Sequence, residues 1–345
     1  MRQTLKRVVY GVFAILLLIL PLLSKSDYDL FVTNRALLNI ILASGLVFLT
    51  GFAGQISLGQ AGFCAIGAYT SAIITTKLGM PIIVGVLAAV FLSAITGFLV
   101  AIPSFKLKAF FLSLLTVSFG QIVYLLIVNM TTVTGGSQGL FNIPLLKIGN
   151  EFFTNTGYYY LFLALVALVL GLMYRIKYSH IGRMMFAVND DETAAEACGV
   201  NSKMAKMFAF SFSAALAGLS GALYSHMLGF LTPDPFTSSD SGNYVAMAVV
   251  GGLRHLSGGV VGGVILTWLP ELLRLNIRGF ENYYLIFNAA IVLFIIVFLP
   301  KGLGESLFRG LAKLWGEKES AMTLKRPKTN PRLDSGAGPK AEERK

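Results

Sequence analysis

The chain has 345 residues, of which 55% are hydrophobic and 13% charged, and its net charge is +11. Soluble domains carry about 25% charged residues, and 17 of the 45 charged residues here lie in 301–345. The preceding 300 residues are too poor in charge to cover the surface of a soluble domain. Composition therefore excludes a soluble enzyme and a disordered chain, and it predicts an all-α polytopic membrane protein.

The first 300 residues contain about ten runs that are apolar enough to cross a bilayer, which requires about 20 residues each. The run 242–253 is short, and 53–62 is too rich in glycine and polar residues to face lipid. We therefore expect one or two short or broken spans, buried in protein or lining a watery cavity. The predicted spans are 8–23, 36–52, 59–78, 81–103, 109–130, 158–176, 207–229, 242–253, 258–275 and 282–300.

The positive charges are spread between the apolar runs and are not gathered on one face, so we expect membrane lipid and no nucleic acid as a partner. With the N-terminus inside, the short inner connections carry more Lys and Arg than the outer ones. This bias predicts that both termini are cytoplasmic. Residues 1–300 would form the transmembrane domain, and 301–345 a basic, disordered cytoplasmic tail. The run 8–23 lacks a small-x-small cleavage site after it, so we expect a retained helix and not a signal peptide.

Small residues recur at four-residue spacing in the later spans. Gly258 and Gly262, Gly259 and Gly263, and the row Ala214, Gly218 and Ala222 follow this spacing. Such rows let helix backbones approach closely, so we expect them to pack helices together and to carry no chemistry.

Charged side chains are absent from 109–146 and from 207–233. A proton-driven transporter usually places titratable groups at membrane depth, and these segments offer none. The dipeptide Gly-Lys occurs nowhere, so the chain has no Walker A loop. If this chain takes part in active transport, a partner must hydrolyse the nucleotide.

The inner connection 177–206 contains four basic and four acidic residues. Asn189 followed by Glu192 predicts a helix start, and Gly199 predicts its end. The short helix between them would present small residues at Ala194, Ala195 and Cys198, and acidic ones at Asp191, Glu192 and Glu196. Such a helix could enter a groove on a partner or be an ordinary solvated loop helix, and composition alone leaves both open.

The segment 51–69, GFAGQISLGQAGFCAIGAY, resembles a hallmark segment of the permease subunits of branched-chain amino acid ABC importers, the LivM/LivH type. The segments 134–140, 182–224 and 251–263 are similar to that family's outer loop, coupling loop with its next helix, and late glycine-rich segment. The resemblance covers about residues 30–300 and is closer to the LivM branch. Arg254 and His255 depart from it, because glycine with Ser or Thr is expected there.

This resemblance implies a permease subunit that is not itself an enzyme, in a bacterial inner membrane. It implies a second, LivH-like permease, two cytoplasmic ATP-binding subunits and a periplasmic binding protein that delivers Leu, Ile or Val. ATP and magnesium would bind to the ATP-binding subunits, and this chain would hold no cofactor or metal. Sister branches carry urea, short amides or sugars, so the cargo stays open.

The resemblance and the polar residues of the spans also suggest site residues. The translocation pathway would include Gln55, Ser57, Gly59, Gln60, Gly62, Ser118 and Gln121. The segment 189–200 would couple to ATP hydrolysis, through Asn189, Asp191, Glu192, Ala195, Glu196 and Gly199.

Two other interpretations are open. Ser220, within Gly-Leu-Ser-Gly, resembles the nucleophile of rhomboid-type intramembrane proteases. His226 lies six residues along the same helix, about 9 Å away, so only a histidine elsewhere, such as His255, could serve as its base. The chain could also be a passive channel or secondary carrier. Gly135–Gly139 matches G-x-S-x-G, but an outer loop between membrane helices lacks the strand that a nucleophile elbow requires.

Overall fold

The computed structural model describes residues 26–104, 109–148, 151–253 and 255–276, together with Pro21 and Ala290. The chain divides into two units, Met1–Leu307 and Phe308–Lys345, and all described residues belong to the first. Apart from Pro21 and Ala290, the predicted spans 8–23 and 282–300 lie outside the described residues, as do the predicted tail 301–345 and Arg254.

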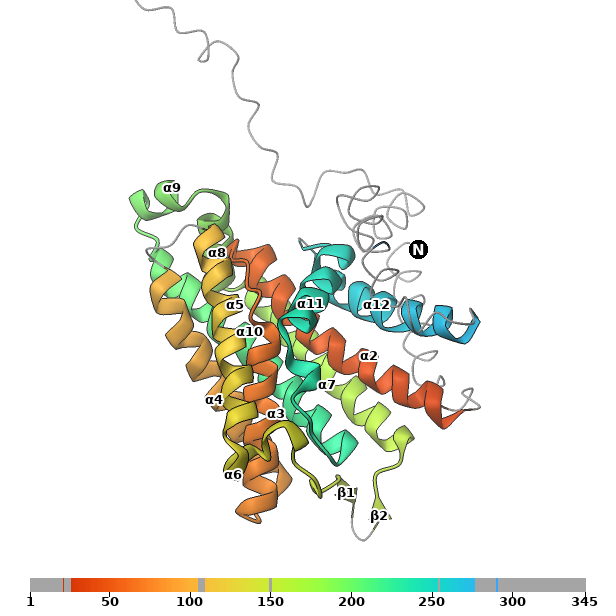
Figure 1. Ribbon diagram of the computed structural model, residues 1–345. Coiled ribbons are helices and arrows are strands. Elements are labelled where there is room, and N and C mark those ends of the chain that lie inside the picture. The colour runs from red at the N-terminus through yellow and green to blue at the C-terminus, as the bar shows by residue number, and fades with distance from the viewer. Residues whose placement is uncertain are drawn as a thin grey trace, which may run out of the picture. The chain divides into compact units, whose positions relative to one another are not determined.

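The described part is built almost wholly of helices (Figure 1). A two-residue antiparallel pair, β1 (Lys147–Ile148) and β2 (Glu151–Phe152), lies in the loop before α7. The helices are α2 (Asp27–Leu46), which continues as a π-helical turn (Val47–Phe52), α3 (Gln60–Lys77), α4 (Ile82–Ser104), α5 (Ala109–Asn129), α6 (Thr131–Thr134), the 3-10 turn Gly136–Gln138, α7 (Asn155–Tyr178), α8 (His180–Asp190), α9 (Glu192–Ala197), α10 (Ser202–Leu228), the 3-10 turn Asp234–Phe236, α11 (Ser238–Gly251) and α12 (Ser257–Asn276).

Six helices of the described part are long and apolar enough to cross a membrane. Two further predicted spans appear as helices that do not meet this criterion: α3, and α11 with 14 residues. The six are Asp27–Phe52, Ile82–Pro103, Phe110–Asn129, Asn155–Tyr178, Ser202–Leu228 and Ser257–Leu275.

The first described span begins at Asp27 and not at position 36, so its predicted start is wrong by nine residues. The first turns contain polar residues, so the apolar run that marks a span begins later than the helix itself. Ser26 caps it by accepting a hydrogen bond from the N–H of Tyr28, and Asn34 is fully buried, donating to the carbonyl oxygen of Asn155 on α7. A polar side chain with a partner on a neighbouring helix is compatible with a membrane bundle.

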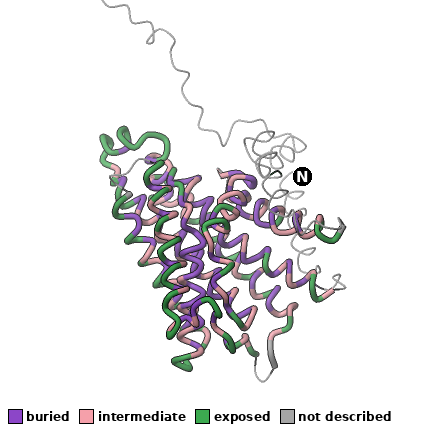
Figure 2. Tube along the Cα trace, in the orientation of Figure 1, coloured by how far each residue is buried: buried purple, intermediate pink, exposed green. Residues whose placement is uncertain are grey.

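Helix α10 lies at the centre of the described bundle and packs against α2, α3 and α4 (Figure 1). Figure 2 shows the buried residues running through the interior and the exposed ones along its outer helices and at α9. The π-helical turn is entirely within this core except for Thr50. Helices α8 and α9 lie at the opposite end of the bundle from α6 and the β1–β2 pair (Figure 1).

Glycine permits the closest helix contacts, as the small-residue rows predict. A Cβ atom on Gly67 of α3 would lie 2.4 Å from the Cα atom of Gly218 on α10. One on Gly262 would lie 1.7 Å from the carbonyl oxygen of Met247, and one on Gly259 would lie 2.4 Å from the Oγ atom of Ser44. Side chains at these positions would force the backbones apart, so the rows pack helices as expected.

Replacing Gly67 by valine should therefore disrupt the α3–α10 contact and cost at least about 2 kcal/mol of stability. Gly171 on α7 is a matched control, because a Cβ atom there meets nothing within 4 Å, and G171V should cost less than about 1 kcal/mol. The thermal stability and yield of the purified protein measure both. Equal behaviour of the two variants would contradict the close packing.

Candidate translocation and coupling sites

The chain leaves helical geometry between α2 and α3, at residues 54–59, a segment called here the break. Gly54 begins it with a positive φ of +69°. At membrane depth a backbone N–H without a partner costs several kcal/mol, so the break needs hydrogen-bond acceptors from elsewhere. Leu58 donates its N–H to Oγ1 of Thr116 on α5 at 3.0 Å, and Ala61 donates to Oγ of Ser241 on α11 at 3.0 Å.

The polar side chains of the break and of the first turn of α3 point into the core. Ser57 and Gln60 are fully buried, and Gln55 is 8% exposed. The amide nitrogen of Gln60 donates to Oγ of Ser213 on α10 at 3.0 Å. The Oε1 atoms of Gln55 and Gln60 have no hydrogen-bond partner among the described residues. The break and the first turn of α3 thus form a junction to which α5, α10 and α11 each contribute a hydroxyl group.

Two glycines of the predicted pathway allow α5 to approach this junction. A Cβ atom on Gly59 would lie 2.3 Å from the carbonyl oxygen of Thr116, and one on Gly62 would lie 2.9 Å from Cα of Gly120. The structure therefore brings together five of the predicted pathway residues inside the chain's own packed interior. They are Gln55, Ser57, Gly59, Gln60 and Gly62.

The other two predicted pathway residues lie on an outer surface. Ser118 and Gln121 are exposed near the middle of α5, and Ser238 and Ser239 are exposed in the first turn of α11. These four residues are called here the polar face. Oγ of Ser238 donates to Oε1 of Gln121 at 3.1 Å, which joins the two helices. Exposed polar groups on a membrane helix usually face protein or a water-filled cavity.

Sequence reasoning missed Ser238 and Ser239, although a signal for them exists. Thr237 and Asp240 form a capping box, in which Thr237 accepts from the N–H of Asp240 and the Asp240 carboxylate accepts from the N–H of Thr237. This box begins α11 at Ser238, which places the two serines together on its first turn.

The loop helix of 177–206 is α9, and its boundaries differ from the prediction. Asp191, and not Asn189, is the N-cap residue, accepting from the N–H of Ala194 at 3.0 Å. Asn189 instead belongs to the last turn of α8, because that helix runs on to Asp190. Gly199 ends the helix as predicted, with a φ of +82°, and the N–H groups of Gly199 and Val200 bond to the carbonyl oxygens of Glu196 and Ala195.

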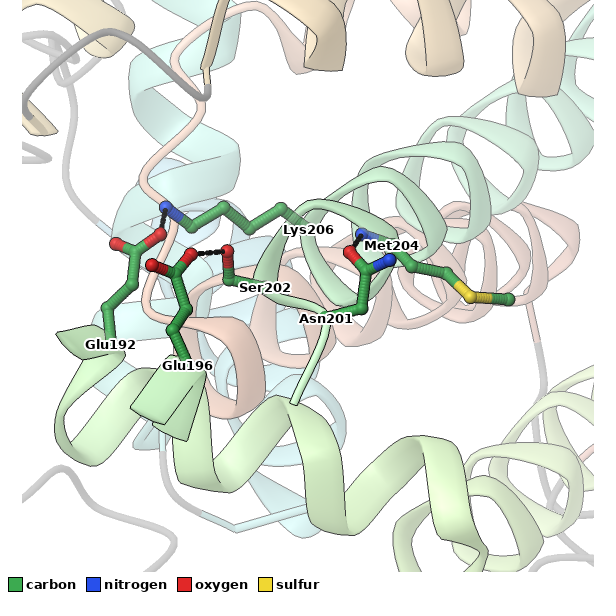
Figure 3. Close-up of polar contacts among 6 residues, drawn as sticks. All are labelled: Glu192, Glu196, Asn201, Ser202, Met204 and Lys206. Atoms are coloured by element: carbon green, nitrogen blue, oxygen red, sulfur yellow. Dashed lines mark hydrogen bonds and ion pairs between the residues drawn. The ribbon is translucent and has the colours of Figure 1, made fainter. Parts of the chain in front are cut away.

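The acidic residues of α9 hold it to the first turns of α10 (Figure 3). Glu192 forms an ion pair with Lys206, which is 6% exposed, and Glu196 accepts a hydrogen bond from the hydroxyl of Ser202. Ala195 is buried, whereas Ala194 and Cys198 are exposed, so the predicted small-residue face does not lie on one surface. The reason is that α9 packs Ala195 against its own chain.

Asn189 points toward the transmembrane helices. Its Nδ2 atom donates to the carbonyl oxygen of Gly51, in the π-helical turn, at 3.0 Å. Of the six predicted coupling residues, Asn189 thus contacts the π-helical turn, and the other five belong to α9 and its caps.

The polar contacts of Ser220 argue against a protease. Its hydroxyl donates to the carbonyl oxygen of Leu38 on α2 at 3.0 Å, and not to a base. The ring of His226 lies between Oγ of Ser71 and the carbonyl oxygen of Pro144, at 2.8 Å from each. A nucleophile requires a base within hydrogen-bond reach, and this arrangement instead fixes helices and a loop together.

Comparison with known proteins gives the family. Residues 30–296 match the family described as branched-chain amino acid transport system, permease component. The chain belongs to this permease family. The permease is 31% identical over 306 residues to the high-affinity branched-chain amino acid transport system permease protein LivM of Salmonella typhimurium, covering 82% of this chain and 71% of the relative.

Other relatives include a second LivM protein and a sugar permease. LivM of Escherichia coli is 29% identical over the same shares of the two chains. The ribose import permease protein RbsC of Haemophilus influenzae is 24% identical, covering 85% of this chain and 93% of the relative. No solved structure matches the permease. These relatives are named as transport components and not as proteases.

Replacing Ser220 by alanine tests whether Ser220 has a structural role or acts as a nucleophile. We expect transport by the assembled permease to stay within about twofold of wild type, since one hydrogen bond contributes only about 1 kcal/mol net. Ser225→Ala is a matched control, because Ser225 is a buried serine of the same helix that bonds within that helix. Loss of activity in S220A alone would contradict a purely structural role.

Proposed function

We propose that the permease is one of two homologous membrane subunits of an ATP-driven importer that carries leucine, isoleucine and valine across the bacterial inner membrane. The observation that carries this proposal is the 31% identity to a LivM protein over 82% of the chain. The chain is also 23% identical to LivH of Salmonella typhimurium over 281 residues. Likeness to both kinds of subunit supports a complex built from two related permeases.

In this proposal both termini and α8–α9 are cytoplasmic, and the segments 8–23 and 282–300 complete a bundle of about ten spans. Basic residues near α8 and α9, including Arg175, Lys177, Arg183 and Lys203, support the assignment of that end. The opposite end, where Ser137, Gln138 and Phe141 are exposed, would receive a periplasmic binding protein.

The translocation path would lie along the polar face, between this permease and the second one. Ser118 and Gln121 supply hydroxyl and amide groups in mid-span, where lipid would disfavour them. The break lies behind this face with the first turn of α3. Leu58 of the break is bonded to α5 through Thr116, and Ala61 of α3 is bonded to α11 through Ser241. Movement of the break would therefore shift the walls of the path, as alternating access requires.

The ATP-binding subunits, which would hold ATP and magnesium, would dock on α9. This helix is exposed along its length apart from Ala195 (Figure 2). It is nevertheless held to α10 through Glu192 and Glu196. Because α9 is exposed and is also bonded to α10, a displacement of the docked subunit would be transmitted to the bundle.

One observation supports an alternative cargo in place of leucine, isoleucine and valine, such as urea, a short amide or another amino acid. The permease is similar to a ribose import permease over 85% of its length, so one scaffold serves different solutes. The cargo would then be chosen by the binding protein, and not by this chain.

Purification of the complex in mild detergent, followed by reconstitution into liposomes, tests the proposal. We expect a second permease, two ATP-binding subunits and uptake of radiolabelled leucine that requires ATP and a binding protein. Uptake by this chain alone, without ATP or other subunits, would contradict it. Uptake of ribose or urea but not leucine would support the alternative cargo.

A bulky residue on the exposed side of α9 should block docking. In Ala194→Trp we expect the ATP-binding subunits to be lost on purification and uptake to fall about tenfold or more. The indole would clash with the docked subunit, and each 1.4 kcal/mol of lost binding free energy weakens the affinity about tenfold. Ala167→Trp, on the exposed side of α7, is the matched control and should retain both. Unchanged subunit content in A194W would contradict docking at α9.

A further inference from the structure

We propose that Asn189 is a positioning residue that links α8–α9 to the break, so that its side-chain amide passes the motion of the docked ATP-binding subunits into the translocation path. The inference rests on the proposed function. Asn189 is singled out by its contact with the π-helical turn, which its predicted role as a helix start did not indicate.

The contact of Asn189 with α2 is direct and close. Its Nδ2 atom donates to the carbonyl oxygen of Gly51 at 3.0 Å. A Cβ atom on Gly54, the first residue of the break, would lie only 2.4 Å from Oδ1 of Asn189. The amide group therefore packs across the point where the π-helical turn ends and the break begins.

Aromatic contacts accompany this hydrogen bond. The ring of Phe186, one turn before Asn189 on α8, lies 4.8 Å from the ring of Phe52 in the π-helical turn. Phe52 in turn contacts Phe48, which packs 4.6 Å from Phe212 on α10. The ring contacts hold α8 against the π-helical turn, but they do not fix its position along that turn. The hydrogen bond of Asn189 fixes this position, because it requires one carbonyl group, that of Gly51.

Two further contacts tie α9 to the first turns of α10. Glu192 pairs with Lys206, and Glu196 bonds to Ser202, both in the first turns of α10. A displacement of α9 would therefore act on α10 through these pairs and on α2 through Asn189. The relative motion of α2 and α10 would be imposed at the break.

The break then passes displacement to the polar face. Leu58 is bonded to Thr116, two residues before Ser118 on α5, and Ala61 is bonded to Ser241, three residues after Ser238 on α11. The contacts between different elements on this route are hydrogen bonds, an ion pair and ring contacts between described residues, and the backbone joins one contact to the next. The π-helical turn at its centre is a geometry that is frequent at functional sites.

The deciding experiment compares Asn189 with a second asparagine of the same connection. Asn189→Ala and the isosteric Asn189→Asp, which lacks the amide donor, both remove the bond to Gly51. Asn201→Ala is the control, because Asn201 lies at the α10 end of the same connection and caps α10 by accepting a hydrogen bond from the N–H of Met204 (Figure 3). Complex yield, basal ATP hydrolysis, hydrolysis stimulated by loaded binding protein, and leucine uptake are measured for each.

We expect N189A and N189D to assemble and to keep basal ATP hydrolysis, while leucine uptake per ATP hydrolysed falls about tenfold, in the range typical of coupling between sites. N201A should keep the wild-type ratio. A ratio that stays unchanged in N189A, or a parallel loss in N201A, would overturn the proposal. If wild-type complex itself shows no ATP-dependent uptake, the proposed function fails and not this contact.

A double variant separates a positioning role from a merely structural one. Thr116→Val removes the acceptor that holds the break from the side of α5. Combined with N189A, it should reduce the uptake-to-hydrolysis ratio by less than the product of the two single effects, because both variants release the same segment. Fully multiplicative effects would show that Asn189 and the break act independently, and would overturn the link.

Discussion

The structure of the permease depends on how the break, which is not helical, forms its backbone hydrogen bonds among apolar helices. Such a segment must find its acceptors and donors in other helices, because lipid offers none. Leu58 in the break and Ala61 in the first turn of α3 meet this requirement through hydroxyl groups of Thr116 and Ser241. The helices that supply these groups are therefore tied to one point, and the break cannot move without them.

Around this point the bundle separates two kinds of contact. Glycines such as Gly67 and Gly262 bring backbones together by shape alone, which suits an interior where burial from water provides no driving force between helices. Polar contacts concentrate at the break, at α9 and along the polar face. The first kind gives the bundle its rigidity, and the second marks the places where the proposed transport cycle acts on it.

Sequence reasoning anticipated the helical bundle, the glycine rows, the short loop helix and the glycine that ends it, because spacing and turn chemistry are local. It failed where a polar residue finds its partner far along the chain. Asn34 is buried against α7, which hid the start of α2, and Ala195 packs inward because Glu192 and Glu196 hold α9 to α10. Ser238 and Ser239 of the polar face were missed because their exposure depends on how α5 and α11 meet, although the capping box of Thr237 and Asp240 marks the start of α11.

The central claim is that the break and α8–α9 move as one unit during the cycle. Hydrogen–deuterium exchange on the reconstituted complex, with and without ATP and loaded binding protein, measures this at the amides of Leu58, Gly59 and Ala61 and of residues 189–200. The account predicts that both sets change their exchange together when nucleotide binds, with the amides of Leu58 and Ala61 protected in the resting state by Thr116 and Ser241. Break amides that exchange at the same rate in every state, while uptake proceeds, would contradict it.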